Sequence, residues 1–267
     1  MTYFIHSLQG RRDSNEDQHY VFENLDGDDK SKAKLNLYCV FDGHGGKLVS
    51  KYLRDNLPNY FTYKDCEKNL ADKHMATKYF KKVFDKIQET LEINHPKASA
   101  YCGSTCNICI ITKPKNKENN YLYIANLGDS RSVISKKNNI AKSLSIDHKP
   151  NLPKEKERIN KLGGSIRYDG SDWRVNDLSL SRAFGDNDSK PYVSHRPDIF
   201  KHKILKDDNF LVVGCDGLWD VLSNQLVCDY IRKLKENNYK GNYAKSLAEY
   251  AFEKGSYDNI SVIVKFL

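Results

Sequence analysis

The sequence predicts an α+β protein with a central antiparallel β-sandwich that is flanked on both faces by helices. Three observations support this fold class: strand-length apolar runs recur along the chain, helical periodicity clusters in two places, and strands and helices do not alternate strictly. Strict alternation is typical of a parallel, doubly wound sheet, whereas clustered helices indicate outer layers packed on antiparallel sheets.

Five apolar runs have the length and the β-branched or aromatic content of strands. They span residues 37–41, 107–111, 121–125, 210–215 and 260–266. The last run alternates, with apolar residues at even positions and the polar Ser261 and Lys265 on the other face. We expect this strand to cover one side of a core.

Helical periodicity appears first around Phe80, Val83 and Phe84, and the stripe predicts one helix from about residue 67 to 93. The pattern returns at 226–234 and at 244–251, separated by Gly241 and Asn242. Each stripe needs an apolar partner, so we expect these helices to cover the sheets.

The 267 residues allow one large domain or two small ones. No internal repeat or linker recommends a boundary, so we expect a single domain over residues 1–267. The net charge of +8 bears on association rather than on fold. Because the basic residues are scattered, we expect a solvated surface and no nucleic-acid partner.

The seven cysteines are odd in number and spread along the chain, which favours a reducing compartment over a disulfide framework. Cys102, Cys106 and Cys109 are interpreted as buried core cysteines rather than as a zinc site. No secretory signal, lipidation motif or apolar run of roughly 18 residues is found. We therefore expect a monomer in the cytoplasm or the nucleus, without a membrane partner.

Acidic residues stand at the ends of the predicted strands. Asp42 and Asp216 each follow an apolar run and precede a glycine, and Asp258 precedes the last strand. Asp129 and the pair Glu16-Asp17 extend the pattern. Each aspartate taken alone reads more readily as a turn former. Together, carboxylates at one sheet edge need a cation, and oxygen ligands favour Mg²⁺ or Mn²⁺.

A pair of such ions can activate a bridging water and clamp a phosphoryl group, which makes phosphoester hydrolysis the natural chemistry. Arg12 and His44 stand beside the predicted ligands in sequence. Arginine binds phosphate with two donors, and histidine titrates near neutral pH. Taken alone, Arg12 is better explained as a solvated charge, and His44 as a surface or hydrogen-bonded core residue.

Eight segments, in order, resemble the metal-dependent serine/threonine protein phosphatases of type 2C, the PPM family. They begin at Gly10, Val40, Gly103, Asn126, Asp147, Ser181, Cys215 and Asp258. They read GRRDSNED, VFDGHGG, GST, NLGDSR, DHKP, SRAFGD, CDGLWD and DNISV. The resemblance spans nearly the whole chain and implies hydrolysis of phosphoserine and phosphothreonine in phosphorylated protein substrates.

The resemblance also implies ligands for two metal ions and a looser third position. Asp42 would bridge both ions, with Glu16 and the Gly43 carbonyl completing one set. Asp216 and Asp258 would complete the other set. The third position would be held by Asp129 together with Asp216, and Asp220 matches a further acid nearby.

For catalysis, the resemblance implies that Arg12 binds the substrate phosphate and that His44 is the general acid for the leaving oxygen. Asp17 would hold water coordinated to a metal. The chain departs from the family pattern at Asn176-Asp177-Leu178, which is one residue shorter and lacks a glycine. This departure puts substrate access in question there, near the family's flap.

The alternative is a noncatalytic pseudophosphatase or binding module that docks partners through the basic surface. An inactive relative is expected to lose metal carboxylates. Because Glu16, Asp42, Asp216 and Asp258 are all present, the sequence favours an active enzyme.

Overall fold

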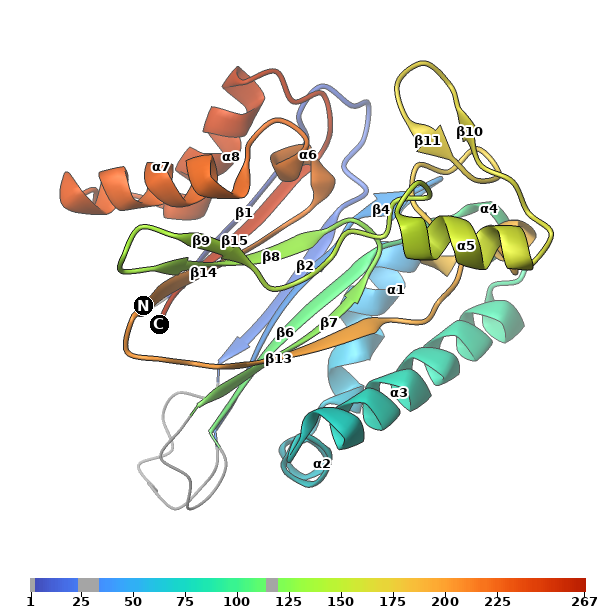
Figure 1. The fold of residues 1–267 in the computed structure, drawn as a ribbon, viewed down its shortest axis with the longest axis horizontal. Coiled ribbons are helices and arrows are strands. Elements are labelled where there is room, and N and C mark those ends of the chain that lie inside the picture. Colours follow the sequence, from blue (N-terminus) through green and yellow to red (C-terminus); the bar gives the residue numbers. More distant parts are fainter. Residues whose placement is uncertain (1–2, 24–33, 114–119) are drawn as a thin grey trace.

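The computed structural model describes residues 3–23, 34–113 and 120–267, and two five-stranded antiparallel sheets form its centre (Figure 1). The first sheet has the order β1 (Tyr3–Leu8), β15 (Ile260–Phe266), β14 (Asp208–Gly214), β8 (Arg131–Lys136), β9 (Ala141–Ser143). The second has the order β13 (Asp198–Lys203), β7 (Tyr121–Leu127), β6 (Cys106–Lys113), β3 (Lys34–Phe41), β2 (Gln18–Glu23). All five predicted strands are confirmed.

The two sheets face each other across an apolar layer. Val40 of β3 and Ile124 of β7 belong to the same buried cluster as Val213 of β14 and Ile263 of β15. Successive side chains of a strand point to opposite faces, so the other face of each sheet is left for the helices.

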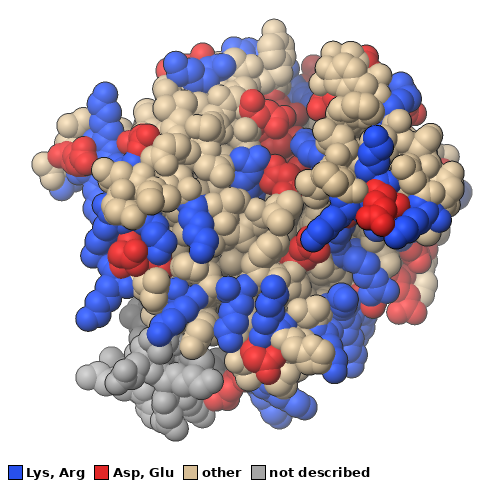
Figure 2. Space-filling view, in the orientation of Figure 1, with Lys and Arg blue, Asp and Glu red and all other residues tan. Residues whose placement is uncertain are grey.

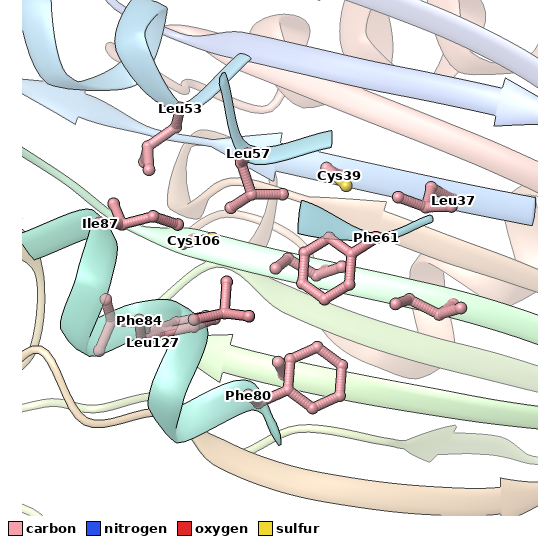
Figure 3. Close-up of a cluster of buried hydrophobic side chains, with 14 of the residues drawn as sticks. Leu37, Cys39, Leu53, Leu57, Phe61, Phe80, Phe84, Ile87, Cys106 and Leu127 are labelled. Carbon is pink, nitrogen blue, oxygen red and sulfur yellow. The ribbon is translucent and has the colours of Figure 1, made fainter. Parts of the chain in front are cut away.

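Helices cover both outer faces, which confirms the predicted sandwich. The second sheet carries α1 (Leu48–Asn56), η1 (Leu57–Tyr60), α2 (Tyr63–Asn69) and α3 (Lys73–Asn94). Figure 3 shows Leu53, Phe80, Phe84 and Ile87 of these helices directed at Cys39 and Cys106 of the sheet. The first sheet carries α6 (Asp216–Trp219), α7 (Asn224–Glu236) and α8 (Tyr243–Glu253).

Shorter elements lie at one end of the sandwich. They are β4 (Gly43–His44), α4 (Ala98–Tyr101), β5 (Gly103–Ser104), α5 (Pro153–Lys161), β10 (Arg167–Tyr168), β11 (Trp173–Arg174), β12 (Phe184–Gly185) and η2 (Asn187–Ser189). The strands β12, β5 and β4 form a small sheet of their own, and β10 pairs with β11. The small sheet brings residues 43–44 beside residues 103–104, next to the ends of β3 and β6.

Two local predictions are corrected. The helix expected over 67–93 is broken between α2 and α3, because the Asp72 carboxylate caps the N-terminus of α3 by accepting a hydrogen bond from the Met75 N–H (2.8 Å). Strand β15 is buried on both faces: Ser261 is fully buried, and Lys265, 6% exposed, pairs with Glu23 (2.5 Å). The second sheet covers the face that carries Ser261 and Lys265, so the strand contributes to two cores rather than to one.

All seven cysteines are free and buried. Cys106 belongs to the cluster beneath α3, whereas Cys109 belongs to the layer between the sheets, so these two thiols lie on opposite faces of β6. They do not converge on one zinc site. Over residues 3–23, 34–113 and 120–267, no helix has the length and apolar character that crossing a bilayer requires.

Candidate metal centre

The acidic residues at the strand ends surround one cleft of about 440 Å³. Apart from Asp17 and Asp220, the residues predicted for the site all line it: Arg12, Glu16, Asp42, Gly43, His44, Asp129, Asp216 and Asp258. Figure 2 shows acidic side chains inside a hollow of this face, while Lys and Arg are spread around it. Residues far apart in the chain thus meet at one end of the sandwich.

Three carboxylates form the centre of the cleft. Asp42, Asp129 and Asp216 each offer an oxygen atom within 4.8 Å of the others. Burial and the charge of Asp216 raise the pKa of Asp42, and burial and the charge of Asp129 raise the pKa of Asp216. Ionised carboxylates at this spacing repel, so the arrangement favours a bound cation.

Asp42 follows β3 and is held by Thr105. The Asp42 N–H donates to Thr105 Oγ1 (3.0 Å), and the Thr105 N–H donates to the Asp42 carbonyl (2.8 Å). Thr105 Oγ1 also lies 2.7 Å from Ser130 Oγ, beside Asp129. Thr105 therefore links the backbone of Asp42 to Ser130, the residue after Asp129, a role that its position in the sequence does not reveal.

Gly43 brings the backbone close to Glu16. A Cβ atom at Gly43 would lie 2.4 Å from the Glu16 carbonyl oxygen, so no larger residue fits. The Glu16 carboxylate accepts a hydrogen bond from the Gly46 N–H (2.9 Å). The Glu16 side chain and the Gly43 backbone are thereby placed at the same wall of the cleft.

Asp216 and Asp258 are joined by a second close approach. A Cβ atom at Gly217 would lie 2.0 Å from the Asn259 carbonyl oxygen. The Asn259 side chain accepts from the Glu16 N–H (2.8 Å) and donates to the carbonyl of Ser14 (2.9 Å). Asn259 thus links three predicted ligand segments, a role that no local pattern in the sequence indicates.

Arg12 and His44 lie on the rim. Arg12 Nη2 contacts Asp258 Oδ2 at 2.6 Å, and the Arg12 side chain is 61% exposed. His44 Nε2 lies 2.8 Å from Asp186 Oδ2. Burial lowers the pKa of His44, but the bond with Asp186 and the charges of Asp186, Asp129 and Glu16 together raise it. The sequence places Asp186 at the end of the SRAFGD segment but does not indicate its role.

Asp17 lies beneath the cleft and is only 3% exposed. It belongs to a second group of potential ligand atoms with Asp42 and Cys215. Neither carboxylate oxygen accepts a hydrogen bond of ordinary geometry from the described part of the chain, and burial raises the pKa of Asp17 to about 6. A buried carboxylate without partners, beside an oxygen-rich cleft, fits a site for Mg²⁺ or Mn²⁺.

Comparison with known proteins agrees with this geometry. The protein phosphatase 2C family model matches residues 1–260. The chain belongs to this family of serine/threonine protein phosphatases. Phosphatases of this family generally depend on Mg²⁺ or Mn²⁺.

Individual relatives match over nearly the whole chain. Probable protein phosphatase 2C 7 of rice is 36% identical over 98% of the chain, and bovine protein phosphatase 1L is 34% identical over 98%. The chain spans 64% of the rice protein and 71% of the bovine protein. A serine-threonine phosphatase 2C from Toxoplasma gondii has the same fold (TM-score 0.82, 22% identity, 99% of this chain and 94% of that one).

The departure from the phosphatase 2C pattern at Asn176-Asp177 is a tight turn. Both residues have positive φ (46° and 68°), and Val175 and Leu178 exchange two backbone hydrogen bonds of 3.0 Å. Asn and Asp tolerate this conformation better than other residues with a side chain, which allows the turn without a glycine. Asp177 and Leu178 line the cleft, so the shortened segment forms part of its wall.

Proposed function

We propose that this phosphatase 2C chain hydrolyses phosphoserine and phosphothreonine in proteins with two divalent ions, Mg²⁺ or Mn²⁺, and a weaker third. The observation that carries the proposal is the convergence of Asp42, Asp129 and Asp216 in a cleft that also holds Arg12 and His44. When bound, two such ions lower the pKa of water and neutralise the oxygens of a phosphoryl group.

The ligands follow from the walls of the cleft. Asp42 would be a ligand of both ions, and Glu16 with the Gly43 carbonyl would complete the ligands of one of them. Asp216 and Asp258 would hold the other, a role supported by the close approach of Gly217 to Asn259 that brings their segments together. Asp129 contributes to the weaker third position.

Protein side chains orient the substrate and move its proton. Arg12 lines the cleft and is bonded there to Asp258 through Nη2, which leaves its other guanidinium N–H groups available to bind a phosphate. His44 donates a proton to the leaving seryl or threonyl oxygen, and Asp186 supports the protonated form. Asp17 accepts hydrogen bonds from water through its two free oxygen atoms.

The substrates are phosphorylated proteins, without nucleic-acid or membrane partners, and the chain acts as a monomer in the cytoplasm or nucleus. The seven free, buried cysteines support a reducing compartment.

The test is hydrolysis of a phosphothreonine peptide by the purified chain, with Mn²⁺ and with EDTA. We expect turnover only with the metal and its loss in Asp216→Asn. Asp207→Asn removes the same charge from an exposed side chain outside the cleft and serves as the matched control. Folded protein without metal-dependent turnover would support the noncatalytic alternative.

A further inference from the structure

The acidic centre contains an ammonium group that the mechanism above does not use. Lys149 Nζ lies 2.5 Å from Asp129 Oδ2. The Asp129 side chain is 2% exposed and that of Lys149 is 27% exposed. By contrast, the pair Lys161–Glu157 on α5 has both side chains more than half exposed, as surface ion pairs usually do.

Residues on both sides of Asp129 hold the segment that carries Lys149 in place. His148 donates its N–H to the Gly128 carbonyl (3.0 Å), and its Nδ1 accepts from the Gly128 N–H (3.1 Å). Asp147 accepts two hydrogen bonds from Arg131, at 3.0 and 2.6 Å. Residues 147–149 are thus fastened to the turn that carries Asp129, and the lysine is aimed at its carboxylate.

The surrounding charges also favour the ammonium at this point. Asp129, Asp216 and Asp220 all raise the pKa of Lys149, although burial opposes them. The Lys149 ammonium therefore places one positive charge against Asp129, one of the three central carboxylates. Asp42 and Asp216, the other two carboxylates of the centre, have no ion pair with any Lys or Arg of the described chain.

We propose that Lys149 is a built-in competitor for the third divalent ion: its ammonium occupies the position beside Asp129 that this ion needs. The inference rests on the third position of the proposed function. The two main ions bind at Asp42 and Asp216, where no described lysine or arginine competes with them. The third ion must displace the Lys149 ammonium from Asp129. This competition lowers the affinity of the third site for its ion, so the occupancy of the site depends on the metal concentration.

The test measures Mn²⁺ binding to the full chain by equilibrium dialysis and electron paramagnetic resonance of free Mn²⁺. In Lys149→Met we expect the weak site to bind roughly ten-fold tighter, the order expected for losing one charge-assisted contact, with the tight sites unchanged. Lys149→Arg keeps the charge and should retain weak binding. Lys142→Met, at an exposed lysine of β9, controls for net charge. Unchanged or weaker binding in Lys149→Met would overturn the proposal.

A second measurement uses the wild-type chain, in case the variants do not fold. Acetic anhydride labels free amines, and mass spectrometry reports the label at Lys149. We expect labelling of Lys149 to rise over the Mn²⁺ range that fills the weak site, because the ion displaces the ammonium. Constant or falling labelling over that range would contradict displacement. Absence of tight Mn²⁺ binding would instead refute the proposed function, so the two failures are distinguishable.

Discussion

Two clusters of buried acidic residues in this protein have opposite electrostatic characters. Around Glu155, which is 1% exposed, both carboxylate oxygens are paired: Oε1 lies 3.1 Å from Arg182 Nε, and Oε2 lies 2.8 Å from Arg158 Nη2. Burial alone would raise the pKa of Glu155, but the two arginines lower it to about 2. In the cleft, burial and mutual repulsion raise the pKa values of Asp42 and Asp216.

The difference lies in where the chain supplies its own cations. Arginines complete the Glu155 cluster, which therefore stabilises the fold without help. In the cleft, Arg12 pairs with Asp258 and Lys149 pairs with Asp129, but no Lys or Arg of the described residues pairs with Asp42 or Asp216. Asp42 and Asp216 are left to cations from solution, which is what a metal-dependent catalyst requires. The predictions below test this contrast.

The largest effect is expected for Asp42→Asn. Removing the carboxylate shared by both ions should lower kcat/KM for a phosphothreonine peptide by at least about a thousand-fold, or about 4 kcal/mol of transition-state stabilisation. The melting temperature in EDTA should not fall, because the substitution relieves repulsion with Asp216. A large loss of stability in EDTA would show that Asp42 is paired within the protein.

Glu155→Gln should have the opposite effect to Asp42→Asn: it should lower stability and leave metal binding intact. Leaving Arg158 and Arg182 without their buried partner should cost about 3–5 kcal/mol of unfolding free energy, measured in urea, while Mn²⁺ binding is retained. Because the pKa of Glu155 is lowered in the fold, its stabilisation is complete above its ordinary pKa and is lost as pH falls towards about 2. Glu157→Gln, on the exposed side of α5, is the control and should be neutral. Equal stability of Glu155→Gln and wild type would contradict the contrast.

His44→Asn tests whether His44 is the general acid. We expect a loss of roughly a hundred-fold on phosphothreonine, where the leaving oxygen needs a proton, and a much smaller loss on an aryl phosphate. Asp186→Asn should show the same substrate dependence with a smaller loss, because it removes only the partner of His44. Equal losses on both substrates would count against the general acid.

The smallest effect is a pH dependence of stability without metal. Raised pKa values of the cleft aspartates mean that the folded chain binds more protons than the unfolded chain. In EDTA, stability should therefore fall as pH rises from about 4 through about 6, where Asp17 titrates. Saturating Mn²⁺ should flatten this slope. Melting curves across that range, with and without metal, measure it, and identical slopes would contradict the effect.

Local patterns in the sequence predicted the strands and helices that form the layers of the fold, and also the acidic residues that meet in the cleft. Alternating or continuous apolar runs identified β3, β14 and β15, and the aspartates at their ends do meet in one cleft. The break before α3 was missed because it depends on the cap at Asp72. The burial of Lys265 was missed because its partner, Glu23, is far away in sequence.

The supporting contacts of the site were beyond sequence reasoning for the same reason. Thr105, Asp186 and Asn259 stand within recognisable motifs, yet each acts on a residue more than 60 positions away. No periodicity records such pairings, since only the folded chain brings the segments together. The acids were easier to find because each one ends or begins a strand.

Calorimetric titration of the wild-type chain and of Asp42→Asn with Mn²⁺ tests the central claim most directly. If the cleft depends on cations from solution, the wild-type chain should bind two ions tightly, and Asp42→Asn should lose this binding while remaining folded. Absence of tight binding to the folded wild-type chain, or equal binding by the two proteins, would contradict it.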